Sequence, residues 1–356
     1  MKVLNIDLDE RKWRQLTLPV KMGGFGIRSV TDIALPAFIS SYHKSKETMD
    51  IITPSSIKDE PYLDAYIAEQ RWLDTPGITN DDLPKFKSYQ SNWDSPLCKL
   101  EQKSLNNEAT NDVDRARLID ISQPHASDWL EALPSANVGL KMENKQFRVV
   151  SALRLGANVC QPHTCACGKV VERNGLHGLS CKRSAGRLPR HSQVNDLIKR
   201  ALSSGVTAAT REPYGISRHD GKRPDGMTMY PWKSGKCLLW DFTCGDTLAP
   251  SHLQQSCKEP GKVASEAENH KIKHYEHLGP SYHFTPICIE TLGVWGELGM
   301  AFIKDVGKSI IDQSGEKRST SFLFQSIGMA VQRGNAMSML GTLQQNDIPL
   351  EEIFLL

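Results

Sequence analysis

Four side chains that bind metal ions well lie close together near the middle of the chain. Cys165 and Cys167 are separated by one residue, and His177 and Cys181 complete the group within 17 positions. Short paired spacings of this kind are typical of tetrahedral zinc sites, because one turn can then deliver two ligands. All four ligand positions would be filled by protein, so we expect a structural Zn²⁺ rather than a catalytic one.

Two residues just upstream leave the exact ligand set open. Cys160 or His163 could replace one of the four ligands, and a chance grouping of free cysteines is the remaining alternative. Gly168 and Gly175 suit the tight turns of a compact zinc-binding knuckle, since glycine readily adopts positive φ. A zinc knuckle is therefore expected soon after a predicted helix over 145–156.

The composition narrows the class of protein. A chain of 356 residues, with 39% hydrophobic and 24% charged residues, is typical of a folded globular protein with two or three domains. Its nine cysteines are odd in number and scattered, which argues against a disulfide framework. No apolar signal-peptide region follows Met1, and no apolar run approaches the length of a membrane span. We expect a nuclear or cytoplasmic protein without a membrane partner.

The net charge of +2 does not by itself demand a polyanionic partner, so any contact with nucleic acid has to be local. A basic stretch directly follows the cysteine cluster, and such a stretch favours a phosphate backbone nearby. Its members are Lys182, Arg183, Arg187, Arg190, Lys199 and Arg200, continued by Arg218, Lys222 and Arg223.

Hydrophobic periodicity predicts a compact α/β domain after the cluster. Apolar residues recur first at helical spacing, then in short strand-like runs that alternate with a second helix. The expected order is helix 192–203, strand 206–210, strand 227–230, strand 236–243, helix 263–278 and strand 284–291. A turn at 233–235 joins the second and third strands. This order indicates an α/β fold.

The rest of the chain is expected to be helical. A glycine-rich stretch at 23–26 predicts a tight turn before a helix over 29–41, and Pro36 either kinks that helix or marks its true start. Residues 57–144 are predicted to form a helical linker without chemistry of its own. The tail alternates helical patterns with a break at Gly334 and Asn335.

Two aspartates could converge on one divalent cation. Asp225 precedes the second predicted strand, and Asp241 follows the apolar run of the third. Carboxylates from neighbouring strands suit Mg²⁺, which would activate a water for attack on a phosphodiester. Lys271 could stabilise the developing anion, and Glu268, about one helical turn away, could face the same cleft. Lys273 would point about 160° away from Lys271 on a regular helix, so only one of these lysines can serve.

Each of these signals is weak alone. A Pro-Asp-Gly sequence is usually only a turn, which is the simpler interpretation of Asp225 by itself. His191 could contact a phosphate or support the site, or it could face solvent at the start of a helix. Glu212 could join the cation site from the end of the first strand. Trp232 and Trp240 are expected in the core rather than as platforms for bases.

The order and spacing of these residues resemble the restriction-endonuclease-like, or PD-(D/E)XK, nuclease fold. More narrowly, the sequence is similar to the C-terminal endonuclease region of site-specific non-LTR retrotransposons. There a Cys-Cys-His-Cys knuckle precedes an Arg-His pair, a Pro-Asp, a second acidic residue on the next strand and a displaced lysine on a helix. The matching residues are Cys165, Cys167, His177, Cys181, Arg190, His191, Pro224, Asp225, Asp241 and Lys271.

The resemblance spans most of the chain and is specific from about 160 to 275. The stretch 18–26 looks like the segment that follows the reverse-transcriptase palm in such polyproteins. The implied fold is a mixed sheet flanked by helices, preceded by the zinc knuckle and a helical N-terminal region. The expected divisions are 1–56 after the palm, 57–144 as linker, 145–190 with helix and knuckle, 191–310 as nuclease, and 311–356 as C-terminal helices.

The resemblance implies an enzyme that nicks target DNA with the help of Mg²⁺. The partners it implies are DNA, element RNA and a longer polyprotein that contains a reverse transcriptase. The candidate catalytic residues are Asp225, Asp241, Lys271 and Glu268, and the candidate nucleic-acid contacts are Arg187, Arg190, His191 and Arg223.

Three departures from the family pattern keep a second function open. One residue separates Cys165 from Cys167 where the family usually has more, and Thr243 stands where the plain motif has its lysine. No Tyr-x-Asp-Asp polymerase motif occurs, so this chain is not expected to reverse transcribe. The alternative function is a catalytically inactive, zinc-stabilised nucleic-acid-binding remnant of a mobile element.

Overall fold

The computed structural model describes residues 6–54, 63–216 and 223–343. Its contacts divide the chain into two compact units, one of residues Trp13–Glu108 and one that combines Met1–Lys12 with Ala109–Leu356. Five short helical elements occur between the longer helices and strands described below. They are α1 (Glu10–Thr17), η1 (Val20–Met22), η3 (Asn80–Asp82), α10 (Leu253–Ser256) and η4 (Glu276–Leu278).

The unit of residues 13–108 is helical, as expected. It contains α2 (Val30–Ile52), α3 (Leu63–Leu73) and α4 (Gln90–Asn107) around a small core. Trp72 and Trp93 lie at the centre of that core, and the indole nitrogen of Trp72 donates to the Trp93 carbonyl at 2.9 Å. The turn at 23–26 is confirmed by the left-handed φ of Gly23, 93°.

The expected boundaries of the first long helix are wrong. α2 begins at Val30, before Pro36, and continues to Ile52 rather than ending near residue 41. Pro36 therefore lies inside the helix and does not mark its start. Ile39 is fully buried in the core of this unit, and tertiary packing of that kind stabilises a helix beyond what local propensity predicts.

Three helices that precede the cysteine cluster belong to the larger unit: α5 (Asp112–Asp120), α6 (Asp128–Glu131) and α7 (Asn144–Leu155). α7 confirms the helix expected over 145–156. α6 and α7 pack against α13 (Ser319–Leu340), and α5 packs against α10. The C-terminal part of the predicted linker 57–144 therefore packs within the larger unit and does not form a separate linker.

A four-stranded mixed sheet forms the centre of the larger unit. Its strands are β3 (Ala209–Arg211), β4 (Gly226–Lys233), β5 (Lys236–Gly245) and β6 (Tyr282–Glu290), in the order β3-β4-β5-β6. β3 and β4, and β4 and β5, pair antiparallel, whereas β5 and β6 run parallel. The expected turn at 233–235 is confirmed by left-handed backbone at Ser234 and Gly235.

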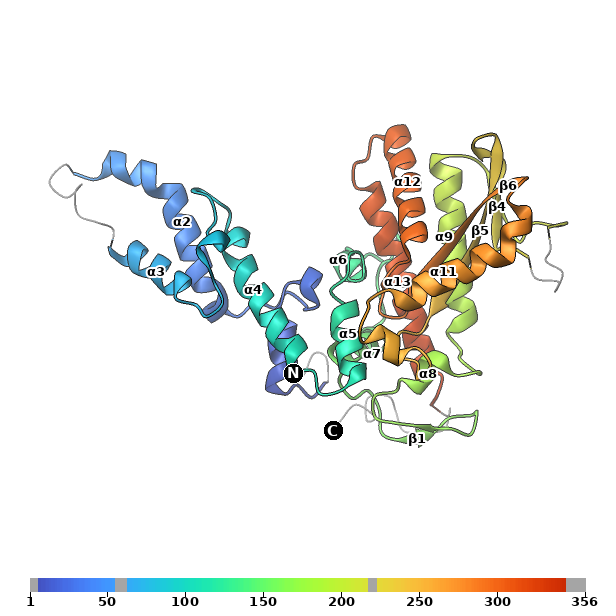
Figure 1. The fold of residues 1–356 in the computed structure, drawn as a ribbon, viewed down its shortest axis with the longest axis horizontal. Helices are drawn as coiled ribbons and strands as arrows, with labels where there is room; N and C mark the ends of the chain where they lie inside the picture. The colour runs from blue at the N-terminus through green and yellow to red at the C-terminus, as the bar shows by residue number, and fades with distance from the viewer. Residues whose placement is uncertain (1–5, 55–62, 217–222, 344–356) are drawn as a thin grey trace. The chain divides into compact units, whose positions relative to one another are not determined.

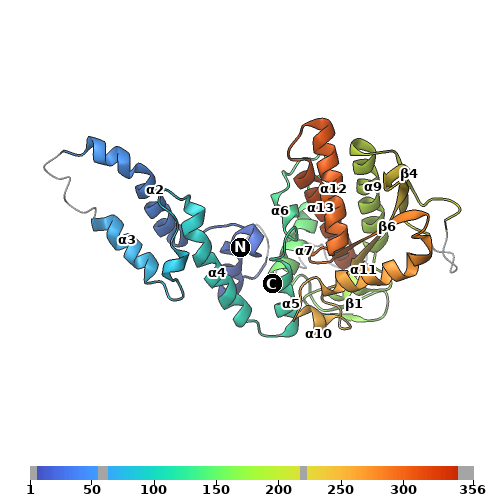
Figure 2. The same cartoon turned by 45° about the horizontal axis from the view of Figure 1, so that its top comes forward.

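Helices cover the sheet as the expected order of elements requires. α9 (Arg187–Gly205) precedes β3, and α11 (Lys262–Tyr275) connects β5 to β6, while α12 (Glu297–Ser314) and α13 (Ser319–Leu340) follow β6. Figures 1 and 2 show these helices gathered around the strands. The chain is thus a mixed α/β protein with a mixed sheet flanked by helices.

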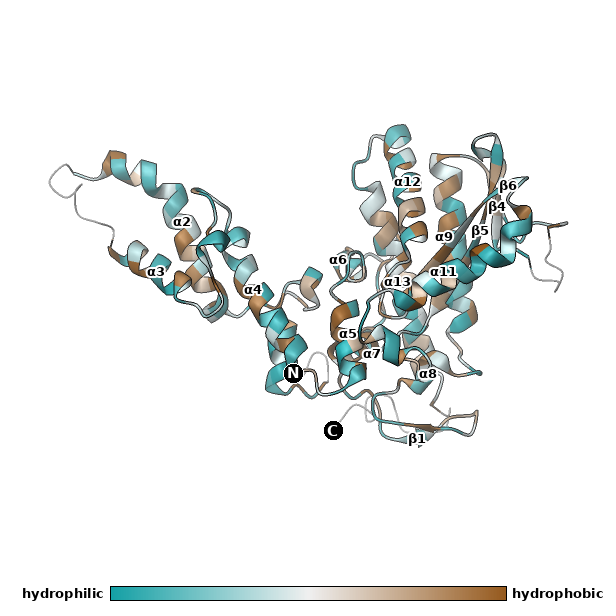
Figure 3. Cartoon of the chain, in the orientation of Figure 1, coloured by the Kyte–Doolittle hydropathy of each residue, from teal (hydrophilic) through white to brown (hydrophobic). Residues whose placement is uncertain are grey.

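The side chains of β5 alternate between two environments. Leu238, Trp240 and Phe242 enter the core that α9, α12 and α13 complete, which confirms the expected burial of Trp240. The intervening residues, including Asp241, face the opposite side, because successive strand residues point to opposite faces. Figure 3 shows hydrophobic colouring along the central strands and mixed colouring on α11 and α12. Asp241 is therefore directed towards α11.

The expected break in the C-terminal helices is wrong. α13 continues through Gly334 and Asn335 without interruption. A β-carbon at Gly334 would lie 2.4 Å from the Arg190 β-carbon, so glycine is required for close packing of α13 on α9. Asn335 is fully buried and donates to the Thr291 carbonyl at 2.7 Å. Tertiary packing thus explains two residues whose local preference is for a turn.

No helix in the described ranges combines the length and the apolar character needed to span a membrane.

Candidate functional site

The four predicted metal ligands come together in one cluster. A small hairpin of β1 (His163–Thr164) and β2 (Val170–Val171) carries Cys165 and Cys167 in its turn, and α8 (His177–Ser180) supplies His177 and precedes Cys181. One ligand atom from each residue lies within 4.8 Å of every other. The cluster could therefore hold a metal ion.

The distances within this cluster fit a tetrahedral ion. The sulfurs of Cys165 and Cys181 are 3.8 Å apart, and the Cys167 sulfur is 3.2 Å from Nε2 of His177. Zinc–sulfur bonds of about 2.3 Å in a tetrahedron place two sulfurs about 3.8 Å apart. Burial also lowers the pKa of His177, which favours the neutral imidazole that a metal requires.

Neither alternative ligand takes part in the cluster. The Cys160 sulfur faces the backbone carbonyls of Glu172 and Arg173, at 3.6 and 3.8 Å. His163 is hydrogen-bonded through Nε2 to the Thr342 hydroxyl at 3.0 Å. The expected turns are confirmed, since Gly168 and Gly175 have φ values of 86° and 66°.

A cleft of about 1010 Å³ opens where the knuckle, α9, the sheet and α11 meet. Its lining brings together most of the predicted catalytic and nucleic-acid-binding side chains. They are Arg187, Arg190, His191, Glu212, Arg223, Asp225, Asp241 and Lys271. Leu179 and Ser180, from the knuckle helix α8, form part of the same wall.

Asp241 has two partners, both from α11. The Lys271 ammonium nitrogen lies 2.5 Å from Oδ1, and the Tyr275 hydroxyl donates to Oδ2 at 2.8 Å. The Asp241 side chain is only 7% exposed, and burial raises the pKa of its carboxyl group, although Lys271 opposes that rise. Lys271 thus balances a charge that is otherwise costly to bury.

Asp225 is fixed beside Asp241 by the pairing of β4 and β5. It immediately precedes β4, and its Oδ2 accepts a hydrogen bond from the Phe242 backbone nitrogen at 2.7 Å. Nε2 of His191 lies 3.1 Å from the same oxygen, and this hydrogen bond raises the pKa of His191. Among the described residues, none forms a hydrogen bond or an ion pair with Oδ1 of Asp225, which leaves this oxygen available to a ligand. His191 therefore contacts the site, and 40% of its side chain remains exposed.

Glu268 does not share this cleft. Its carboxylate is buried and accepts hydrogen bonds from the backbone nitrogens of Leu298 and Gly299, at 3.2 and 2.9 Å. These groups belong to the first turn of α12, whose unpaired N–H groups attract a carboxylate. The expectation that Glu268 and Lys271 face one cleft is wrong, because the start of α12 packs against Glu268. The spacing of the two residues on α11 does not contain this information.

The predicted nucleic-acid contacts divide into exposed and buried side chains. Arg187 and Arg223 are exposed at the rim of the cleft, where Arg223 pairs with Glu212 at 2.5 Å. Arg190 is only 4% exposed and donates to Asn335 Oδ1 at 2.6 Å, so its side chain holds α9 to α13 rather than forming an exposed phosphate contact. Arg218 and Lys222 lie outside the described residues.

Three residues of the cleft were not anticipated from the sequence. Tyr275 contacts Asp241, whereas Asp246 and His252, which follow β5 in the chain, line the same cleft. Asp246 accepts from the Leu248 nitrogen and the Thr291 hydroxyl. The only sequence signal for Tyr275 is its spacing of four residues from Lys271, which places both on one side of α11.

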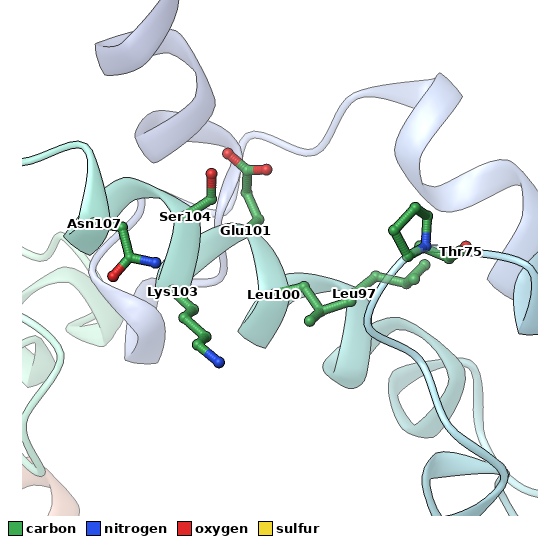
Figure 4. A pocket seen from close by; sticks show the side chains of 8 residues that line it. Thr75, Leu97, Leu100, Glu101, Lys103, Ser104 and Asn107 are labelled. Atoms are coloured by element: carbon green, nitrogen blue, oxygen red, sulfur yellow. The ribbon is translucent and has the colours of Figure 1, made fainter.

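A second hollow, of about 440 Å³, lies within the unit of residues 13–108 (Figure 4). Glu101 and Ser104 of α4 lie on its wall, and both accept hydrogen bonds from Arg14. Lys103 is the other charged residue of its lining. This lining contains neither cysteine nor histidine. The hollow therefore has fewer groups suited to catalysis or metal binding than the cleft of the larger unit.

No protein-family model matches the sequence, and no curated protein matches it either.

Proposed function

We propose that the larger unit is a metal-dependent DNA endonuclease with a restriction-like fold, of the kind found in non-LTR retrotransposons. The observation that carries this proposal is the convergence of Asp225, Asp241 and Lys271 in one cleft from three different elements. Thr243 occupies the strand position of the usual lysine, and Lys271 from α11 supplies an ammonium group at Asp241 instead. The mixed sheet flanked by helices agrees with the architecture that the resemblance implies.

The carboxylates fit a divalent cation with oxygen ligands. Asp225 offers Oδ1, which forms no hydrogen bond with a described residue. Asp241 offers Oδ1, and its contact with the Lys271 ammonium group shows that this oxygen lies where positive charge is favourable. When bound there, Mg²⁺ would activate water and offset charge on the scissile phosphate. His191 and Tyr275 hold the two carboxylates in orientation, each through one hydrogen bond.

The chain's own cations suit a phosphate. Lys271 lines the cleft, where its charge can stabilise the anion that develops during hydrolysis. Arg187 and Arg223 are exposed at the rim and can contact the backbone on either side of the cut. We assign a structural Zn²⁺ to Cys165, Cys167, His177 and Cys181, since their ligand atoms lie within 4.8 Å of one another. Residues of α8 in this knuckle also form one wall of the cleft.

Nicking of supercoiled plasmid in the presence of Mg²⁺ tests the proposal. The full chain should convert the plasmid to open circles, and Asp225→Ala and Asp241→Ala should abolish this activity. Circular dichroism of both variants should match the unmodified chain. Cleavage that persists in both variants would mean that the carboxylates are not the site.

The same experiment decides the alternative of an inactive nucleic-acid-binding remnant. The missing Tyr-x-Asp-Asp motif, and Thr243 in place of the usual lysine, favour this alternative. It predicts that the full chain retards DNA in a gel at low salt, yet yields no open circles with Mg²⁺ or Mn²⁺. Nicking by the full chain that disappears in the two aspartate variants would exclude it.

A further inference from the structure

Tyr214 is 94% exposed, more than any other large apolar or aromatic side chain in the described part of the chain. Single exposed aromatic residues are common and by themselves indicate nothing. The position of Tyr214 is what distinguishes it. It lies two residues after Glu212, which lines the cleft, so its α-carbon is within about 7 Å of that of Glu212.

The segment that carries Tyr214 is anchored to the site. The Glu212 nitrogen donates to the Asp225 carbonyl at 2.8 Å, and Pro213 is buried. Glu212 has a left-handed φ of 48°, which turns the chain at the rim of the cleft. The Glu212 carboxylate also pairs with Arg223 at 2.5 Å. The two residues that precede Tyr214 are therefore fixed at the rim of the cleft.

Arg223 adds a second flat, polar group. Its guanidinium carbon lies 5.8 Å from the centre of the Tyr214 ring, while its side chain remains 42% exposed. Aromatic rings and guanidinium planes are the surfaces on which proteins stack unpaired bases, and the guanidinium can contact the adjoining phosphate as well. In a continuous duplex both faces of a base are covered by its neighbours, so only an unstacked base can use such a surface.

We propose that Tyr214 and Arg223 form a stacking platform for an unpaired base beside the cut. The inference rests on the proposed nuclease and names its substrate class: DNA that is locally unpaired, such as a fork, a flap or a single strand. Trp232 and Trp240 cannot serve as such a platform, because Trp240 is fully buried and Trp232 packs against the core, as the sequence predicted.

A binding experiment tests the platform without requiring cleavage. Forked, single-stranded and fully paired oligonucleotides carry a fluorescent adenine analogue at successive positions, and binding to the full chain is followed without added Mg²⁺. The analogue should be quenched at one unpaired position next to the fork. Tyr214→Ala should remove that quenching and weaken binding to forked and single-stranded DNA about tenfold, while Tyr214→Phe keeps both.

Tyr230 supplies the matched control. It is 66% exposed on β4, but among the described residues no arginine lies over its ring, whereas Arg223 lies over that of Tyr214, so Tyr230→Ala should leave quenching and affinity unchanged. Two outcomes would contradict the proposed platform. Tyr214→Ala could weaken binding to paired and unpaired DNA equally, or Tyr230→Ala could cause the same loss of quenching and affinity as Tyr214→Ala. Plasmid nicking is measured separately. An inert chain that still quenches the analogue would defeat the nuclease alone, and an active nuclease without the quenching would defeat the platform alone.

Discussion

Lys271 holds its ammonium nitrogen 2.5 Å from Oδ1 of Asp241, although 30 positions separate the two residues in the sequence. They meet because the alternation of β5 directs Asp241 towards the side of the sheet that α11 covers. Tyr275, four residues further along α11, contacts the other oxygen of the same carboxylate. One helix thus controls both oxygens of a buried acid in the cleft.

Replacing Lys271 with alanine should slow plasmid nicking by about 100- to 1000-fold, the usual effect of removing a group that stabilises the transition-state anion. The change also leaves the Asp241 carboxylate without its ammonium partner. Lys273→Ala is the matched control, because Lys273 is exposed on the same helix and does not line the cleft. Equal rates for the two variants would show that Lys271 has no special role.

Replacing Tyr275 with phenylalanine should raise the Mg²⁺ concentration needed for half-maximal nicking. The substitution keeps the ring against Phe284, at a centroid distance of 4.5 Å, and removes the hydrogen bond to Asp241. Loss of one such bond costs about 0.5–1.5 kcal/mol, or a few-fold in affinity. Titrations of nicking against Mg²⁺ at constant DNA concentration measure the shift. A lower maximal rate with an unchanged Mg²⁺ midpoint would contradict this role.

The local patterns of the larger unit were predictable from its sequence. A short apolar run predicted β5, Ser234 and Gly235 predicted the hairpin turn, and ligand spacing predicted the metal cluster. These features depend on residues that lie close together in the chain. The order of helices and strands followed from the same short-range signals.

The features that escaped prediction depend on which element covers a given face. Gly334 was expected to break a helix, yet its missing side chain lets α13 approach α9. Arg190 was expected at the surface, yet it donates to Asn335 in the interior. Asp246 carries no recognisable motif, and only the end of β5 brings it into the cleft. No periodicity in the sequence contains this information, because each case requires a contact between distant segments.

Loss of the metal from the knuckle should destabilise the fold and deform the cleft, because α8 contributes to both. Cys165→Ser should lower the zinc content of the purified chain, lower its melting temperature and reduce nicking. Cys160→Ser is the control, since the Cys160 sulfur lies outside the cluster, and it should retain zinc. Metal analysis and thermal melts measure both effects. Zinc retained at an unchanged level in Cys165→Ser would remove Cys165 from the ligand set.

Glu268 should matter for stability and not for cleavage. Its carboxylate accepts from the first-turn nitrogens of α12, and removal of such a cap costs about 0.5–2 kcal/mol. Glu268→Ala should therefore lower the urea midpoint while the nicking rate of the folded chain stays unchanged. Glu266→Ala, at an exposed position of α11, should change neither quantity. If the Glu268→Ala chain were as stable as the unmodified chain but inactive, Glu268 would have the catalytic role that its spacing from Lys271 predicted.

Asp120 should make stability depend on pH. Asp120 and Glu290 are fully buried, and burial, reinforced by the neighbouring Glu290, raises the pKa of Asp120 well above its ordinary value of 3.8. The folded state therefore binds this proton more tightly than the unfolded state. The stabilisation is fully present below pH 3.8 and declines as pH rises towards the folded pKa.

Asp120→Asn removes this titration, because an amide stays neutral at every pH. The variant should gain stability relative to the unmodified chain by about 1.4 kcal/mol for each pH unit above the ordinary value, until the folded pKa is reached. Urea unfolding of both chains between pH 4 and 8 measures the difference, and Asp312→Asn, at an exposed position of α12, should show none. A constant difference across this range would mean that Asp120 titrates alike in the folded and unfolded chain.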